Sequence, residues 1–346
     1  IAKHEAFCKE WLNQYPVLFV SFKDAEAEDF EGAYKMLKMK LADLCKEWAS
    51  AYDMAAVDDD DTRIFLNLKA KKADEDEVKN SLKTLMRMLY AVYGKQVILL
   101  IDEYDVPLAK ASEKDTTENR YYPQMLDVIR GIMSTALKDN EHLKFAVVTG
   151  CLRIAKESIF TGTNNFASYS VVDRSFSEYF GFTQDELESM LAVADRTDKA
   201  GLIKEWYDGY IFGRERMYCP WDVMSFVKSK LDGSYSEAMG PKSYWTNTSE
   251  TSQNLMHGFL GKTMAANERF EQLLAGNTIE CTVNEFVPYH RIYENGTNLW
   301  SAMVETGYLT KAVTGRPPLM PLRIPNRSIQ TVFRQEVWNY FNDKVD

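Results

Sequence analysis

The feature that most constrains the fold is an unbroken apolar run, Val97–Ile101, that leads directly into Asp102 and Glu103. A continuous run of branched aliphatic residues is typical of a strand that is buried on both faces of a parallel sheet. Residues 144–149 are another candidate for such a strand, and residues 17–22 form a short apolar run of strand type. Segments of helical length separate these runs, which predicts right-handed crossovers and a parallel sheet with helices on both faces.

The helical segments are recognised from the spacing of apolar side chains. In residues 30–48 they recur at intervals of three and four, which places them on one face of a helix. Two further helices are expected at about residues 76–93 and 118–138. Residues 58–61 are an acidic run that is expected to be a solvated loop, and residues 167–172 are expected to add a strand.

The character of the chain changes twice after these strands. From about residue 175 to residue 270 helical segments predominate, and the last part shows a helix, paired strands and a final helix. We therefore predict an α/β core at residues 1–174 and a mostly helical subdomain at residues 175–276. Residues 277–346 are predicted to form a small winged-helix-like unit.

Composition excludes several classes of protein. The formal net charge of −10 argues against a chain that is basic throughout, as many nucleic-acid-binding proteins are. The five cysteines are widely spaced and contain no Cys-x-x-Cys pair, which argues against a disulfide framework or a zinc ribbon and favours a reducing cytoplasm. No apolar run approaches the roughly 18 residues of a membrane-spanning helix, so no contact with a membrane is expected.

Asp102 and Glu103 stand where a buried strand leaves the sheet, and ligands of open α/β folds bind at these carboxyl ends. The first acid suits Mg²⁺, which prefers hard oxygen ligands and retains several waters. The second acid suits the polarisation of a water for attack on a γ-phosphate. A buried strand that simply ends in solvated acids would give the same pattern.

A second pair of candidates follows the strand at residues 144–149. If this strand lies beside the strand of Asp102, Thr149 and Arg153 come close to the same edge of the sheet. A hydroxyl there can orient the attacking water, and a guanidinium can stabilise charge on phosphate oxygens. The alternatives are a hydroxyl that caps a strand end and an arginine in a salt bridge at the start of a helix.

These residues lie within a series of stretches that resembles the bacterial AAA-ATPase-like family. Its members are predicted ATPases, often fused to a C-terminal nuclease-like domain of the PD-(D/E)XK superfamily. The similar stretches follow one another through nearly the whole chain: Gln14–Phe22, Val97–Ala111, Leu143–Phe166, Phe176–Leu187, Glu205–Gly213, Tyr218–Val223, Tyr244–Ser249 and Leu299–Thr310.

The resemblance implies a P-loop NTPase core of the AAA-like class that uses ATP and Mg²⁺. Asp102 and Glu103 would be its Walker B pair, with Asp102 binding Mg²⁺ and the nucleotide and Glu103 activating water. Thr149 and Arg153 would sense the γ-phosphate. Asn164 is a candidate contact to the nucleotide or a phosphate, although a loop with an Asx turn explains an asparagine there as well.

The sequence departs from the family at the phosphate-binding loop. Gly261-Lys262-Thr263 resembles the end of such a loop, but the motif requires a glycine where Met256 stands, and the preceding segment is polar. In the family this Walker A loop lies upstream of Gln14, so we expect it to precede Ile1 or to be missing. The chain as given is therefore expected to bind ATP weakly and to hydrolyse it very slowly.

The expected partners follow from the same resemblance. A nuclease-like domain would follow the final helix, beyond Asp346, while contacts with nucleic acid and the formation of an oligomer stay open. Two other functions also stay open. The chain can act as a nucleotide-gated regulatory switch for a partner, or as a scaffold that has lost ATP chemistry.

Overall fold

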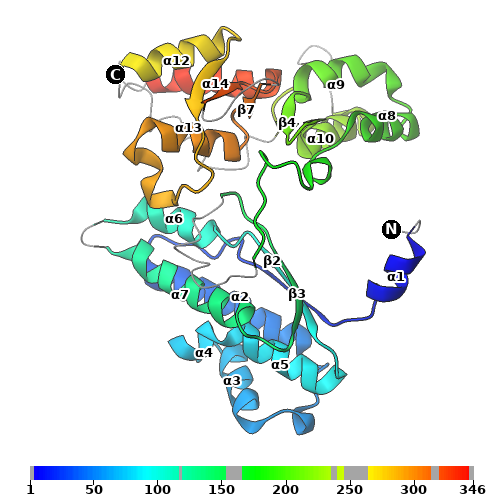
Figure 1. Ribbon diagram of the computed structural model, residues 1–346, viewed down its shortest axis with the longest axis vertical. Helices are drawn as coiled ribbons and strands as arrows, with labels where there is room; N and C mark the ends of the chain where they lie inside the picture. Colours follow the sequence, from blue (N-terminus) through cyan, green and yellow to red (C-terminus); the bar gives the residue numbers. More distant parts are fainter. Residues whose placement is uncertain are drawn as a thin grey trace. The chain divides into compact units, whose positions relative to one another are not determined.

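The computed structural model describes residues 4–116, 119–152, 166–234, 240–244, 264–312 and 319–342. The chain forms two compact units (Figure 1). The first contains residues 1–167 together with Pro288–His290, and the second contains residues 168–287 and 291–346. The finer division of the C-terminal half at residues 276–277 stays a prediction.

The first unit is built on a parallel sheet of three strands in the order β1-β2-β3. These strands are β1 (Val17–Ser21), β2 (Val97–Asp102) and β3 (Leu143–Val148). All three were predicted, because each contains branched or aromatic apolar residues without an internal glycine. The predicted strand at residues 167–172 is wrong, since residues 166–170 are irregular and residues 171–172 lie in a turn.

Helices of the first unit cover one face of this sheet, where alternate strand side chains such as Leu18, Leu99 and Ile101 are buried. Asp29 is the N-cap of α2, and its side chain accepts a hydrogen bond from the backbone of Gly32, while Gly94 caps the C-terminus of α5 in the left-handed conformation. The helices of this unit are α1 (Glu5–Trp11), α2 (Phe30–Trp48), α3 (Asp59–Lys69), α4 (Glu75–Lys79), α5 (Ser81–Tyr93), α6 (Val106–Lys114) and α7 (Tyr121–Leu137).

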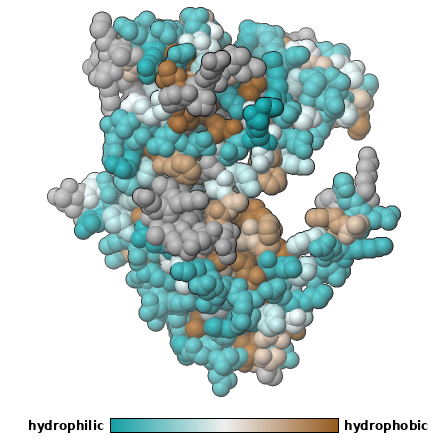
Figure 2. All heavy atoms as spheres, viewed as in Figure 1, coloured by the Kyte–Doolittle hydropathy of each residue, from teal (hydrophilic) through white to brown (hydrophobic). Residues whose placement is uncertain are grey.

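The other face of the sheet differs from the expectation that helices cover both faces. It carries apolar side chains that are exposed among the described residues: Val17, Phe19, Phe145 and Val147. Figure 2 shows this face as a hydrophobic area over β2 and β3, while most of the surrounding surface is hydrophilic. Because side chains alternate along a strand, Asp102 lies on this same face, two residues after Leu100.

The acidic run at residues 58–61 was expected to be a solvated loop, and this prediction is wrong. Asp58 is the N-cap of α3 and accepts hydrogen bonds from the backbone of Asp60 and Asp61. Asp61 is buried and forms an ion pair with Arg87 of α5. The run is acidic because carboxylates at a helix N-terminus satisfy free N–H groups and complement the helix dipole.

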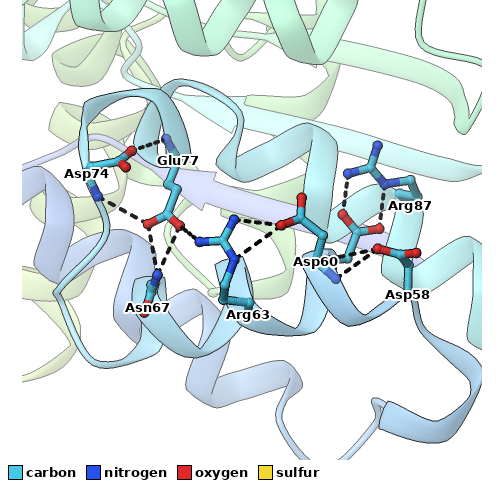
Figure 3. A network of polar contacts seen from close by, with 8 residues as sticks. Asp58, Asp60, Arg63, Asn67, Asp74, Glu77 and Arg87 are labelled. Atoms are coloured by element: carbon cyan, nitrogen blue, oxygen red, sulfur yellow. Dashed lines mark hydrogen bonds and ion pairs between the residues drawn. The ribbon is translucent and has the colours of Figure 1, made fainter.

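A second ion pair ties α3 to α4 in the same region. Arg63 binds the buried carboxylate of Glu77 over 2.5 Å, and Asn67 donates to both oxygens of that carboxylate (Figure 3). Glu77 also forms a capping box with Asp74. A helix was expected without a break over residues 76–93, but the structure has two helices that meet at Asn80.

The second unit contains a helical part and a part with both helices and strands. The helical part has α8 (Gln184–Val193), α9 (Ala200–Tyr207) and α10 (Pro220–Leu231), with a hairpin of β4 (Tyr210–Phe212) and β5 (Glu215–Met217). The mixed part has α12 (Met264–Leu274), β6 (Ile279–Thr282), α13 (Gly296–Glu305), β7 (Thr310–Lys311), β8 (Leu319–Arg323) and α14 (Arg327–Asn342). Its three strands form an antiparallel sheet in the order β6-β8-β7.

Candidate functional site

The candidate site lies at the carboxyl ends of the three parallel strands of the first unit. Ser21 at the end of β1 pairs with Asp102 at the end of β2, and Ile101 pairs with Val148 of β3. This register places Thr149, the first residue after β3, beside Asp102. Parallel strands direct all their carboxyl ends to one edge, which is the edge where open α/β folds bind their ligands.

Asp102 and Thr149 are joined directly. Thr149 Oγ1 donates to Asp102 Oδ1 over 2.6 Å, and the Thr149 backbone N–H donates to the Ile101 carbonyl over 2.8 Å. The hydroxyl therefore fixes one oxygen of the carboxylate and the orientation of its plane. A hydrogen bond to a charged acceptor is stronger than one between neutral groups.

Glu103 follows Asp102 in a left-handed backbone conformation, with φ of 52°. This conformation costs a non-glycine residue roughly 1–3 kcal/mol, and residues with such backbone strain cluster at functional sites. Partial burial raises the pKa of the Glu103 carboxyl, and the negative charge of Asp102 raises it further, whereas Lys23 opposes both effects. A carboxylate that holds its proton more tightly is a better base toward water.

Asp105 is the most enclosed carboxylate of the site. It accepts backbone hydrogen bonds from Cys151 at 3.0 Å and from Leu152 at 2.8 Å. It also accepts a hydrogen bond from the Tyr289 hydroxyl at 2.8 Å. Burial raises the pKa of Asp105, and these donors lower it, because each stabilises the ionised form.

Two further contacts close the loop after β2 onto the loop after β3. The Tyr104 hydroxyl donates to the Leu152 carbonyl over 2.8 Å, and the Tyr104 backbone N–H donates to the Thr149 carbonyl over 3.1 Å. Gly150 packs against Tyr104 and Asp105, since a Cβ at position 150 would lie 2.4 Å from the Tyr104 ring and 2.6 Å from Asp105 Oδ1. Only glycine leaves room for this approach.

The arrangement fits one Mg²⁺ ion that is shared with a ligand. Among the described residues, no group of three or more His, Cys, Asp or Glu side chains is placed to bind a metal without help. Asp102 nevertheless offers an oxygen at the sheet edge that Thr149 does not occupy. Mg²⁺ is commonly bound through one or two carboxylates together with substrate phosphates and waters, so a single carboxylate is sufficient.

The structure brings together three of the five residues singled out from the sequence: Asp102, Glu103 and Thr149. Arg153 and Asn164 lie outside the described residues. The sequence reasoning missed Asp105 and Tyr289. Asp105 stands three residues after Asp102, and this spacing indicates a further acid beside the pair Asp102 and Glu103. No local pattern marks Tyr289.

A parallel α/β sheet whose central strand ends in an acidic pair, bonded to a hydroxyl on the next strand, is consistent with an ATPase-like domain. The comparison with known families agrees. Residues 1–160 match the family model of the AAA-ATPase-like proteins, described as "Predicted AAA-ATPase". The resemblance to this family is therefore confirmed over the segment that contains the acidic pair.

A relative extends the similarity beyond that segment. The chain is 24% identical over 332 residues to a protein of Azotobacter chroococcum mcd 1 described as "Uncharacterized protein in vnfD 5'region". The alignment covers 93% of this chain and 54% of the relative, so the chain spans about half the length of that protein. No solved structure matches the chain. In the described part of the chain, none of the helices has both the length and the apolar character that a membrane crossing requires.

Proposed function

We propose that the first unit binds ATP with Mg²⁺ at the ends of β2 and β3 and hydrolyses it. The observation that carries the proposal is the hydrogen bond from Thr149 to the Asp102 carboxylate at the carboxyl edge of a parallel sheet, with Glu103 next to it. The match of residues 1–160 to predicted AAA-ATPases supports the same conclusion.

Each side chain has a distinct part in this proposal. Asp102 would hold Mg²⁺, and Thr149 would keep the carboxylate oriented toward it. When bound, Mg²⁺ supplies positive charge that neutralises the phosphate oxygens. Glu103 would accept a proton from the attacking water. Arg153 and Asn164 are proposed to contact phosphate groups of the nucleotide.

The phosphate cradle has to come from other residues. The sequence contains no glycine-rich loop that ends in Gly-Lys-Ser or Gly-Lys-Thr with the required spacing. Without such a loop, most of the hydrogen bonds that hold a triphosphate are missing. We therefore propose that residues 1–346 by themselves bind ATP weakly, with slow turnover.

The second unit is proposed to pass the nucleotide state to a partner. Its antiparallel sheet β6-β8-β7 with α13 and α14 is compatible with a winged-helix-like unit, which we propose as the relay. A nuclease-like domain is the proposed partner, on the basis of the family resemblance alone. A cytoplasmic protein fits this proposal.

The test is Mg²⁺-dependent ATP binding and turnover by the natural full-length polypeptide that contains this sequence. Asp102→Asn should weaken binding of the Mg·ATP complex, and Glu103→Gln should lower kcat by roughly 100-fold or more while ATP still binds. Asp60→Asn is a matched control, because Asp60 is an exposed carboxylate of α3. Turnover that is unchanged in both Asp102→Asn and Glu103→Gln would exclude the proposed site and favour a scaffold without ATP chemistry.

A further inference from the structure

Asp105 connects three segments of the first unit that are far apart in the sequence. It lies in the loop after β2, its backbone partners Cys151 and Leu152 lie in the loop after β3, and Tyr289 comes 184 residues later in the chain. Asp105 is 1% exposed and Tyr289 is 8% exposed, so water does not replace these hydrogen bonds. A buried carboxylate is retained only where such donors offset its lost hydration.

The two carboxylates of the site are linked through the backbone between Thr149 and Leu152. Asp105 accepts hydrogen bonds from the N–H groups of Cys151 and Leu152. In the same short segment, the Thr149 hydroxyl donates a hydrogen bond to Asp102. Gly150 fits between Tyr104 and Asp105 without space to spare. A displacement of Asp105 therefore moves the short segment that presents the Thr149 hydroxyl.

Tyr289 lies in a short segment of the first unit that comes from the C-terminal half of the chain. Pro288–His290 pack within the first unit, whereas residues 287 and 291 on either side belong to the second. Tyr289 is also the first residue of a short 3-10 helix, Tyr289–Glu294. The neighbouring His290 ring packs against Tyr122 of α7, with 4.9 Å between ring centroids.

We propose that Asp105 and Tyr289 are positioning residues of the ATP site. The Tyr289 hydroxyl fixes Asp105, Asp105 fixes the backbone of Cys151 and Leu152, and this backbone holds Thr149 against Asp102. The link to ATP rests on the proposed function. Because coupling between two sites is reciprocal, a nucleotide at Asp102 and the placement of Pro288–His290 must then affect each other equally.

The first experiment needs no nucleotide. Tyr289→Phe removes only the hydroxyl, and it should raise the hydrogen-exchange rate of the Cys151 and Leu152 amides by roughly tenfold, the effect of one lost hydrogen bond to a charged group. Tyr52→Phe is the matched control, because Tyr52 is also buried in the first unit and donates one hydrogen bond, to the Leu85 carbonyl. It should leave these two amides unchanged.

The second experiment measures ATP turnover by the full-length protein. Tyr289→Phe should lower kcat by roughly three- to tenfold with little change in KM, because Thr149 is misplaced while the rest of the ATP contacts remain. In the unaltered protein, Mg·ATP should also slow hydrogen exchange in residues 286–292, and Tyr289→Phe should abolish this response. Tyr52→Phe should behave as the unaltered protein in both measurements.

The outcomes separate this proposal from the proposed function. Unchanged exchange at Cys151 and Leu152 in Tyr289→Phe, or an equal rise in Tyr52→Phe, overturns the positioning role, whatever ATP does. ATP turnover that is absent, or that Asp102→Asn does not change, overturns the proposed function and with it the link to ATP. The hydrogen-exchange rates of Cys151 and Leu152 still decide whether Tyr289 positions this segment. Turnover that depends on Asp102 but not on Tyr289 overturns the positioning role alone.

Discussion

Thr149 Oγ1 lies 2.6 Å from Asp102 Oδ1, so a hydroxyl at the end of one parallel strand holds the acid at the end of its neighbour. Thr149→Val keeps the shape of the side chain and removes this hydrogen bond. We expect a loss of roughly 0.5–1.5 kcal/mol in the free energy of unfolding, measured by urea denaturation. ATP turnover should fall as well, because the Asp102 carboxylate is no longer oriented.

The rescue variant for this position is Thr149→Ser, which restores the hydroxyl but not the methyl group. It should recover most of the turnover that Thr149→Val loses. If Thr149→Val and Thr149→Ser reduce turnover equally, the hydroxyl has no part in the site and the methyl group only packs.

Gly150→Ala should destabilise the first unit. The added Cβ would lie 2.4 Å from the Tyr104 ring and 2.6 Å from Asp105 Oδ1, and the short loop has no space into which it can move. We expect a loss of about 1–3 kcal/mol, as for other insertions into tightly packed sites, measured as a shift of the urea midpoint.

Gly201→Ala is the matched control for this substitution. Gly201 lies in α9, and a Cβ there meets no atom within 4 Å. Alanine favours a helix over glycine by about 1 kcal/mol, so this variant should be as stable as the unaltered protein or more so. A Gly150→Ala variant that is equally stable would contradict the described packing of the loops.

The acidic run at the start of α3 contains one carboxylate that matters for stability and one that does not. Asp61 is 4% exposed and binds Arg87, whereas Asp60 is 66% exposed. Asp61→Asn should lower the free energy of unfolding by about 1–3 kcal/mol, because it leaves the buried end of the ion pair with a weaker acceptor. Asp60→Asn should leave thermal unfolding nearly unchanged, since exposed ion pairs contribute little. Equal effects of the two changes would mean that Asp61 is not buried.

The cysteines should differ sharply in reactivity toward a thiol reagent such as iodoacetamide. Burial raises the pKa of Cys45 and Cys219 to about 12 and that of Cys281 to about 11, whereas Cys151 is exposed. The reactive species is the thiolate, which forms only as the pH rises toward the pKa. At pH 8 these three thiols therefore stay protonated in the folded protein.

Mass spectrometry of tryptic peptides after timed labelling measures these rates. We expect Cys151 to be modified well before Cys45, Cys219 and Cys281, and the buried Cys45 and Cys281 should react only after denaturation. Because Cys151 follows Thr149 closely, Mg·ATP should slow its labelling. Rapid modification of Cys45 or Cys281 in the folded protein at pH 8 would contradict their burial.

The sequence by itself determined the three strands of the first unit and the long helices α2 and α7. Apolar runs predicted β1, β2 and β3, and an acidic pair after one of them predicted a site at Asp102 and Glu103, because both signals depend only on neighbouring residues. The helix predicted at about residues 118–138 appears as α7 (Tyr121–Leu137), whereas the preceding α6 was not predicted. The resemblance over residues 1–160 was also readable from sequence alone.

Only the tertiary structure decided which distant residues complete the site. Tyr289 is separated from Asp105 by 184 residues, and a hydrogen bond over that distance leaves no periodic trace in the chain. The same holds for Asp61, whose acidic neighbours suggested a solvated loop until its partner Arg87 was placed by the packing of α3 against α5. Short-range patterns follow from the geometry of helices and strands, whereas a buried polar contact depends on which surfaces the folded chain brings together.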